Sequence, residues 1–168
     1  MNNYLPISTF FAGILGLMAI ALSYIVVMER TSTRVWHGKS PTDVSNQPNY
    51  LEQPGKWAAF LEKYTRKFVT TKSHDDGVLQ RKVRAFGNFV EYVPLALLLL
   101  LMLELIAAPV WLLWFLGIAL TLARIAHACG VIRTYGPSAL RAIGFFLTWI
   151  VYLLGAGTCL YYGVVGVL

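Results

Sequence analysis

The sequence predicts an all-α integral membrane protein, a bundle of four transmembrane helices that forms a single domain over residues 1–168. Composition is the first indication, because 57% of the residues are hydrophobic and only 13% are charged. A soluble domain carries roughly 25% charged residues. The second indication is that the apolar residues form runs long enough to cross a hydrocarbon core of about 30 Å. The third is that all 14 Lys and Arg lie in two windows between these runs, residues 30–84 and 124–141.

The first span is predicted at residues 7–28, which contain no charged side chain and form a helix about 33 Å long. The residues before it carry no basic side chain, although a secretory signal begins with basic residues. We therefore expect this helix to be retained. The fourth span is predicted at residues 142–167, which are also free of charge.

The apolar stretch at residues 93–123 is too long for one crossing, since a single helix of that length would measure about 46 Å. Glu104 and Pro109 interrupt it. Two spans joined by a short turn therefore fit better, at residues 79–106 and 109–130. The earlier of these begins in a polar stretch, so it carries charged side chains into the membrane.

Residues 30–78 form a long loop between the first two spans. Residues 56–69 of this loop place apolar side chains at helical spacing, which predicts an amphipathic helix on the inner leaflet or on the protein's cytoplasmic face. Such a helix can anchor the surface or act as a lid over a site. The positive-inside rule places the two basic windows in the cytoplasm and both termini outside. Membrane lipids are the expected partners of this charge, and no nucleic acid is expected.

Ionisable groups inside a span are costly and indicate a function. The second span begins with Arg84, Asn88, Glu91 and Tyr92 within an arc of about 100° on one helix face. Arg124 and His127 share a face of the third span, and Arg141 opens the fourth. Because the cytoplasmic ends of the three helices meet, we expect these groups to converge. No metal-ligand spacing is present among the His, Cys and acidic residues.

Pairing between Arg84 and Glu91 could simply hold the bundle together. However, Arg84, Arg124 and Arg141 outnumber Glu91, which is the only acid expected at that depth. A surplus of guanidinium groups beside lipid favours an anionic ligand, and arginine binds carboxylates through two hydrogen bonds. The carboxylate among them could bind an ammonium group. The sequence thus predicts a site for a small zwitterion with excess negative charge.

The segment RAFGNFVEYVP, residues 84–94, resembles the signature of the MAPEG family (membrane-associated proteins in eicosanoid and glutathione metabolism). ARIAHACG, residues 123–130, resembles the third-helix motif of the same family, especially in its prostaglandin synthase branch and in its small bacterial members. The second likeness implies a bacterial inner membrane. The family includes microsomal glutathione transferases and the leukotriene and prostaglandin E synthases. The resemblance implies a homotrimer of four-helix subunits, with glutathione as co-substrate between adjacent subunits near the cytoplasmic side.

The resemblance also implies residue roles. The residues that would bind glutathione are Arg84, Asn88, Glu91, Tyr92, Arg124, His127 and, from a neighbouring subunit, Arg34. The residues that would serve catalysis are Arg141, which would stabilise the thiolate, and Arg30 of a neighbouring subunit. Three positions depart from the family pattern: Val131 replaces a common tyrosine, Ala142 replaces a serine of the prostaglandin synthases, and Phe86 replaces a frequent histidine.

The expected function is a glutathione-dependent transferase or peroxidase that acts on lipophilic electrophiles or hydroperoxides within the membrane. A first alternative is a non-catalytic relative that binds glutathione or acts as a scaffold. A second is a small transporter, although a transporter should carry polar residues through the full depth of its spans.

Overall fold

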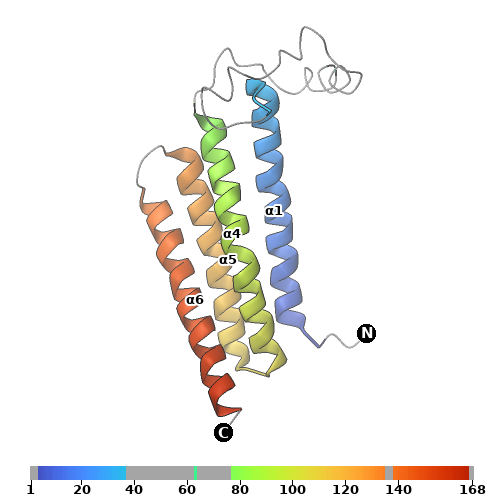
Figure 1. Ribbon diagram of the computed structural model, residues 1–168, viewed down its shortest axis with the longest axis vertical. Helices are drawn as coiled ribbons and strands as arrows, with labels where there is room; N and C mark the ends of the chain where they lie inside the picture. Colours follow the sequence, from blue (N-terminus) through green and yellow to red (C-terminus); the bar gives the residue numbers. More distant parts are fainter. Residues whose placement is uncertain (1–3, 37–62, 64–76, 135–137, 167–168) are drawn as a thin grey trace.

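The computed structural model describes residues 4–36, 63, 77–134 and 138–166, and Figure 1 shows them as a bundle of long helices. The helices are α1 (Pro6–Thr33), α4 (Val78–Leu105), α5 (Val110–Arg133) and α6 (Ala139–Val165). Each is long and apolar enough to cross a membrane, so the predicted fold class is confirmed. The amphipathic helix predicted at residues 56–69 lies outside the described residues, apart from Lys63.

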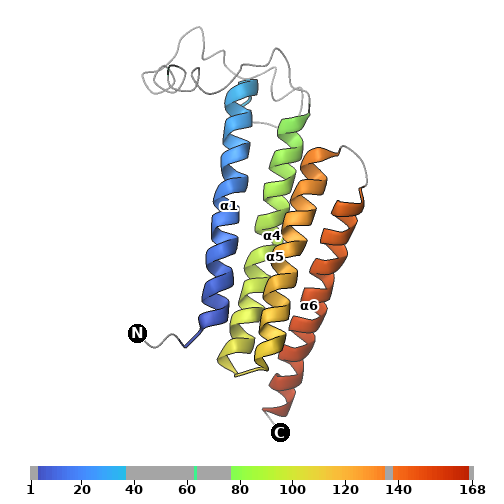
Figure 2. The ribbon, with the colours of Figure 1, turned by 180° about the vertical axis from the view of Figure 1, so that it is seen from behind.

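Helix α5 is the most buried of the four helices and contacts the other three. Figures 1 and 2 show α1 and α6 at opposite sides of the α4–α5 pair. Helix α1 begins and α6 ends at the same end of the bundle, where α4 also turns into α5. We call the opposite end the loop end; there α1 and α5 end, and α4 and α6 begin. The predicted site residues of α4, α5 and α6 therefore lie in the half of the bundle toward the loop end.

The turn between α4 and α5 is as short as the sequence predicts. Ala107 adopts a left-handed conformation, with a φ of 54°. Its N–H donates to the carbonyl of Glu104 (3.1 Å), and the N–H of Ala108 donates to that of Leu103 (2.9 Å). This is the Schellman arrangement that ends many helices. It leaves Pro109 in position to start α5.

The Glu104 carboxylate caps the first turn of α1 from the neighbouring helix. It accepts hydrogen bonds from the backbone N–H groups of Ile7 (2.9 Å) and Ser8 (2.6 Å). The local cap residue, Leu5, has no side-chain acceptor. These N–H groups would otherwise have no partner within the helix, and the positive end of the helix dipole favours a carboxylate there. Glu104 therefore fixes the start of α1 against the end of α4.

We expect Glu104→Ala to lower the free energy of unfolding by about 2 kcal/mol, because two hydrogen bonds to a charged acceptor are lost. Glu104→Gln should cost about half as much, since one oxygen remains as an acceptor. Thermal unfolding of the detergent-purified variants measures both. Equal stability of Glu104→Ala and the parent would contradict the capping role.

Candidate functional site

A cavity of about 280 Å³ lies between α4, α5 and α6 in the half of the bundle toward the loop end. Its lining residues are Gln80, Val83, Arg84, Gly87, Asn88, Glu91, His127, Val131 and Arg141. The structure thus brings together five residues that the sequence singled out, from three different helices. Among the described residues, no group of three or more His, Cys, Asp or Glu side chains could hold a metal ion.

Helix α4 supplies one wall of the cavity. Arg84, Asn88 and Glu91 follow one another at intervals of four and three residues, so they share one helix face. Arg84 and Glu91 are exposed in the single chain. Within the described parts of the chain, neither side chain makes a hydrogen bond or ion pair. The structure therefore does not contain the Arg84–Glu91 pair that could have explained these residues without a ligand.

The opposite wall depends on a very close contact between α5 and α6. A Cβ added to Gly144 of α6 would lie 2.5 Å from the backbone nitrogen of His127 and 2.6 Å from the carbonyl oxygen of Ala123. A Cβ on Gly130 of α5 would lie 2.5 Å from the backbone nitrogen of Arg141. Small residues allow membrane helices to approach this closely. The two glycines thereby bring His127 and Arg141 to the same cavity.

Arg124 and Tyr92 do not line the cavity. Arg124 is only 3% exposed and lies between α4, α5 and α6. Its guanidinium donates to Asn88 Oδ1 (2.9 Å), to the carbonyl of Gly144 (3.3 Å) and to Thr148 Oγ1. It also lies 5.4 Å from the centre of the Tyr92 ring. These two residues therefore form a layer behind the lining residues.

Arg30 and Arg34 lie at the end of α1, on the other side of the bundle from α6. The Arg30 guanidinium donates to the carbonyls of Val35 (3.2 Å) and Trp36 (2.8 Å). Arg34 ends the helix in a left-handed conformation with a φ of 61°. Neither residue lines the cavity of its own chain. A role for them in the site requires a second subunit, as the sequence analysis expected.

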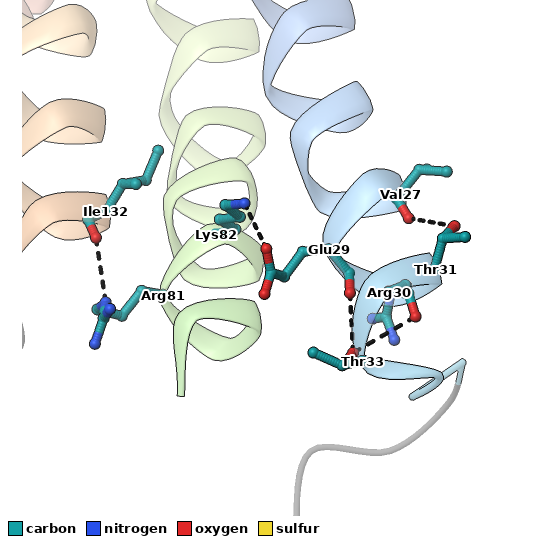
Figure 3. Close-up of polar contacts among 8 residues, drawn as sticks. All are labelled: Val27, Glu29, Arg30, Thr31, Thr33, Arg81, Lys82 and Ile132. Atoms are coloured by element: carbon teal, nitrogen blue, oxygen red, sulfur yellow. Dashed lines mark hydrogen bonds and ion pairs between the residues drawn. The ribbon is translucent and has the colours of Figure 1, made fainter. Parts of the chain in front are cut away.

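Figure 3 shows two further charged contacts at the loop end that the sequence analysis did not consider. Glu29 of α1 is buried and pairs with Lys82 of α4 at 2.7 Å. The Arg81 side chain donates to the carbonyl of Ile132 (3.2 Å), near the end of α5. Glu29 is thus a second acid at the loop end, but it does not line the cavity, and its charge is offset by Lys82. The cavity itself keeps two arginines and one carboxylate.

The lining residues favour a small anion that also carries a positive group. Arg84 and Arg141 offer guanidinium donors to carboxylates, and Glu91 offers an acceptor to an ammonium group. His127 is buried, at 7% exposure, and adds a polar ring on α5. Beside it, Val131 makes that part of the wall apolar.

The fold defines a multi-pass membrane protein, with a cavity between its helices that is lined by two arginines and one carboxylate. The chain belongs to the MAPEG family, whose sequence model matches residues 8–161. It is also similar to the inner membrane protein YecN of Escherichia coli, in strains K12 and CFT073. Each match is 36% identical over 76 residues, which are 45% of this chain and 56% of YecN. No solved structure matches the chain.

Proposed function

We propose that the protein is a membrane-bound glutathione transferase or peroxidase that acts on lipophilic electrophiles or hydroperoxides. The observation that carries this proposal is the cavity whose lining includes two arginines, Arg84 and Arg141, and one carboxylate, Glu91. Glutathione has two carboxylates, one ammonium group and one thiol, so its charges complement this set. Membership of the MAPEG family supports the same ligand.

The residues divide between binding and chemistry. Arg84 and Asn88 bind the peptide's carboxylates and backbone, and Glu91 binds its ammonium group. Arg141 lies at the first turn of α6, where its guanidinium can stabilise the thiolate. The thiolate attacks a substrate that arrives dissolved in the bilayer. With an electrophile, a carbon–sulfur bond forms as the leaving group departs. With a hydroperoxide, the thiolate takes the terminal oxygen, the O–O bond breaks to release an alcohol, and a second glutathione converts the sulfenic acid to the disulfide and water. A glutathione-binding protein without catalysis is the alternative, and Val131 favours it because no hydroxyl group occupies that position in the cavity wall.

The proposal includes a homotrimer. Glu91 is exposed in the single chain, yet it lies about 20 Å along α4 from the start of that helix. A carboxylate at that depth is costly beside lipid and requires protein or water around it. A neighbouring subunit would surround this carboxylate with protein. It would also bring two cations, Arg30 and Arg34, to the cavity. Light scattering of the purified protein should give three chains, and a stable monomer with full glutathione affinity would contradict this arrangement.

The same proposal places the protein in a bacterial inner membrane, with the loop end and the cavity toward the cytoplasm. The similarity to an inner membrane protein supports the location. The gathering of Lys and Arg at residues 30–84 and 124–141 supports the orientation. Labelling of single cysteines from the outside should reach the termini and should not reach the loop.

Glutathione binding by the purified protein, measured by calorimetry, tests the proposal directly. Glu91→Gln should weaken this binding at least about tenfold, because the ammonium group loses its charged acceptor. The control is Glu29→Gln, which removes the carboxylate that pairs with Lys82 and does not line the cavity. This variant should bind glutathione with an affinity within about twofold of the parent's. Binding without turnover of any model electrophile or hydroperoxide would favour the non-catalytic alternative. Unchanged binding by Glu91→Gln would make that carboxylate structural.

A further inference from the structure

Arg124 is a buried cation whose partners within the described residues are all neutral. Its guanidinium donates to an amide oxygen on α4, to a backbone carbonyl on α6 and to the hydroxyl of Thr148, which is itself 1% exposed. The Thr148 hydroxyl in turn donates to the Gly144 carbonyl (2.7 Å). Burial of a charge without an opposite charge is costly, so a specific role has to compensate for it.

The contact with Asn88 has a defined polarity. A guanidinium carries only hydrogen-bond donors, so the atom of the Asn88 amide that faces it has to be the oxygen. The distance from Arg124 to Asn88 Oδ1 is 2.9 Å, which is a normal hydrogen bond. Asn88 also lines the cavity, whereas Arg124 does not. The group that remains for a ligand in the cavity is therefore the NH₂ group, which has two donors and no acceptor.

We propose that Arg124 is a positioning residue that fixes the Asn88 amide in one orientation, so that Asn88 offers only donors to the cavity. Together with Arg84 and Arg141, this makes the part of the wall around Asn88 selective for oxyanions such as carboxylates. A freely rotating amide could equally accept a hydrogen bond from an ammonium or hydroxyl group. This inference rests on the proposed function, because it assumes that an anion occupies the cavity.

Asn88→Asp separates the two faces of this side chain. The new carboxylate still accepts a hydrogen bond from Arg124 and gives this buried cation a negatively charged partner. The melting temperature of the variant should therefore equal or exceed the parent's. The face toward the cavity changes from a donor to a negative acceptor, so glutathione affinity should fall at least about tenfold. A purely structural Asn88 would not combine unchanged or higher stability with lost binding.

Gln80→Glu is the matched control. Gln80 lines the same cavity, the change from amide to acid is the same, and the added charge is the same, but Gln80 makes no hydrogen bond to Arg124. The affinity of Gln80→Glu for glutathione should fall less than about threefold. Arg124→Met provides a second variant, in which a buried charge is replaced by an apolar chain of similar length. Asn88 then loses its fixed orientation, and affinity should fall about fivefold with the fold retained.

Calorimetry with glutathione, and separately with inorganic sulfate, distinguishes the possible failures. If the parent binds sulfate but not glutathione, and Asn88→Asp no longer binds sulfate, the proposed function fails. The inference that Arg124 makes Asn88 a donor to anions in the cavity then still holds. The inference is overturned if Asn88→Asp or Arg124→Met binds the parent's ligand as tightly as the parent does, or if Gln80→Glu loses as much affinity as Asn88→Asp. A lower melting temperature for Asn88→Asp also overturns it, as does a parent that binds neither anion.

Discussion

Gly144→Ala is expected to destabilise the protein by about 3 kcal/mol and to abolish glutathione binding. The new methyl group would lie 2.5 Å from the His127 nitrogen and 2.6 Å from the Ala123 oxygen. Both are backbone atoms of α5, so no side-chain rotation can relieve the clash, and α6 has to move away. That movement also stretches the hydrogen bond between Arg124 and the Gly144 carbonyl. The cavity then loses the alignment of its α5 and α6 walls.

Gly157→Ala makes the same change in the same helix, and it is the control. Apart from the adjacent residues and backbone of its own helix, no atom lies within 4 Å of a Cβ added at Gly157. Alanine is a better helix former than glycine, so this variant should be as stable as the parent or more stable by up to about 1 kcal/mol. Thermal unfolding in detergent and glutathione calorimetry measure both variants. Similar stability for the two variants would show that the α5–α6 contact adjusts more easily than the structure indicates.

The sequence was sufficient to predict the four helices because each span is a long apolar run, and such a run has few other stable arrangements in a membrane. The short turn near Glu104 to Pro109 followed from length, since one helix could not cover both spans, and from the interruption of the apolar run by these two residues. The convergence of Arg84, Asn88, Glu91, His127 and Arg141 was also predictable, because each lies in the half of its helix toward the loop end.

Contacts that depend on how the helices rotate and approach one another were not predictable. Arg124 and Asn88 look equivalent in the sequence, yet one is buried behind the cavity wall and the other lines it. The close approach of α6 to Ala123, His127 and Gly130 of α5 was likewise not predicted. Glu104 looked like a turn residue because its partners, the first N–H groups of α1, are nearly a hundred positions away.

Arg141→Ala is expected to lower transferase activity more than it lowers glutathione affinity. Arg141 lies in the first turn of α6, and Gly130 packs against its backbone, so the position of that backbone at the cavity is fixed. A free thiol has a pKa of about 8.5, so little of it is ionised near neutrality. A guanidinium held beside the sulfur lowers that pKa. Its removal should raise the pKa of bound glutathione by about one unit, which leaves roughly a tenth as much thiolate.

Thiolate absorbance, titrated against pH in the parent and in Arg141→Ala, measures this effect, and turnover with a model electrophile should fall about tenfold in parallel. Arg141→Lys keeps the positive charge, so it should recover part of the thiolate fraction and part of the turnover. Arg133→Ala is the matched control, because it removes an exposed arginine from the same end of the bundle without changing the cavity lining. If Arg141 only anchors the helix end to lipid phosphates, Arg141→Ala and Arg133→Ala will give the parent's titration curve and activity. That result would remove Arg141 from the mechanism and leave Arg30 of a neighbouring subunit as the residue to test.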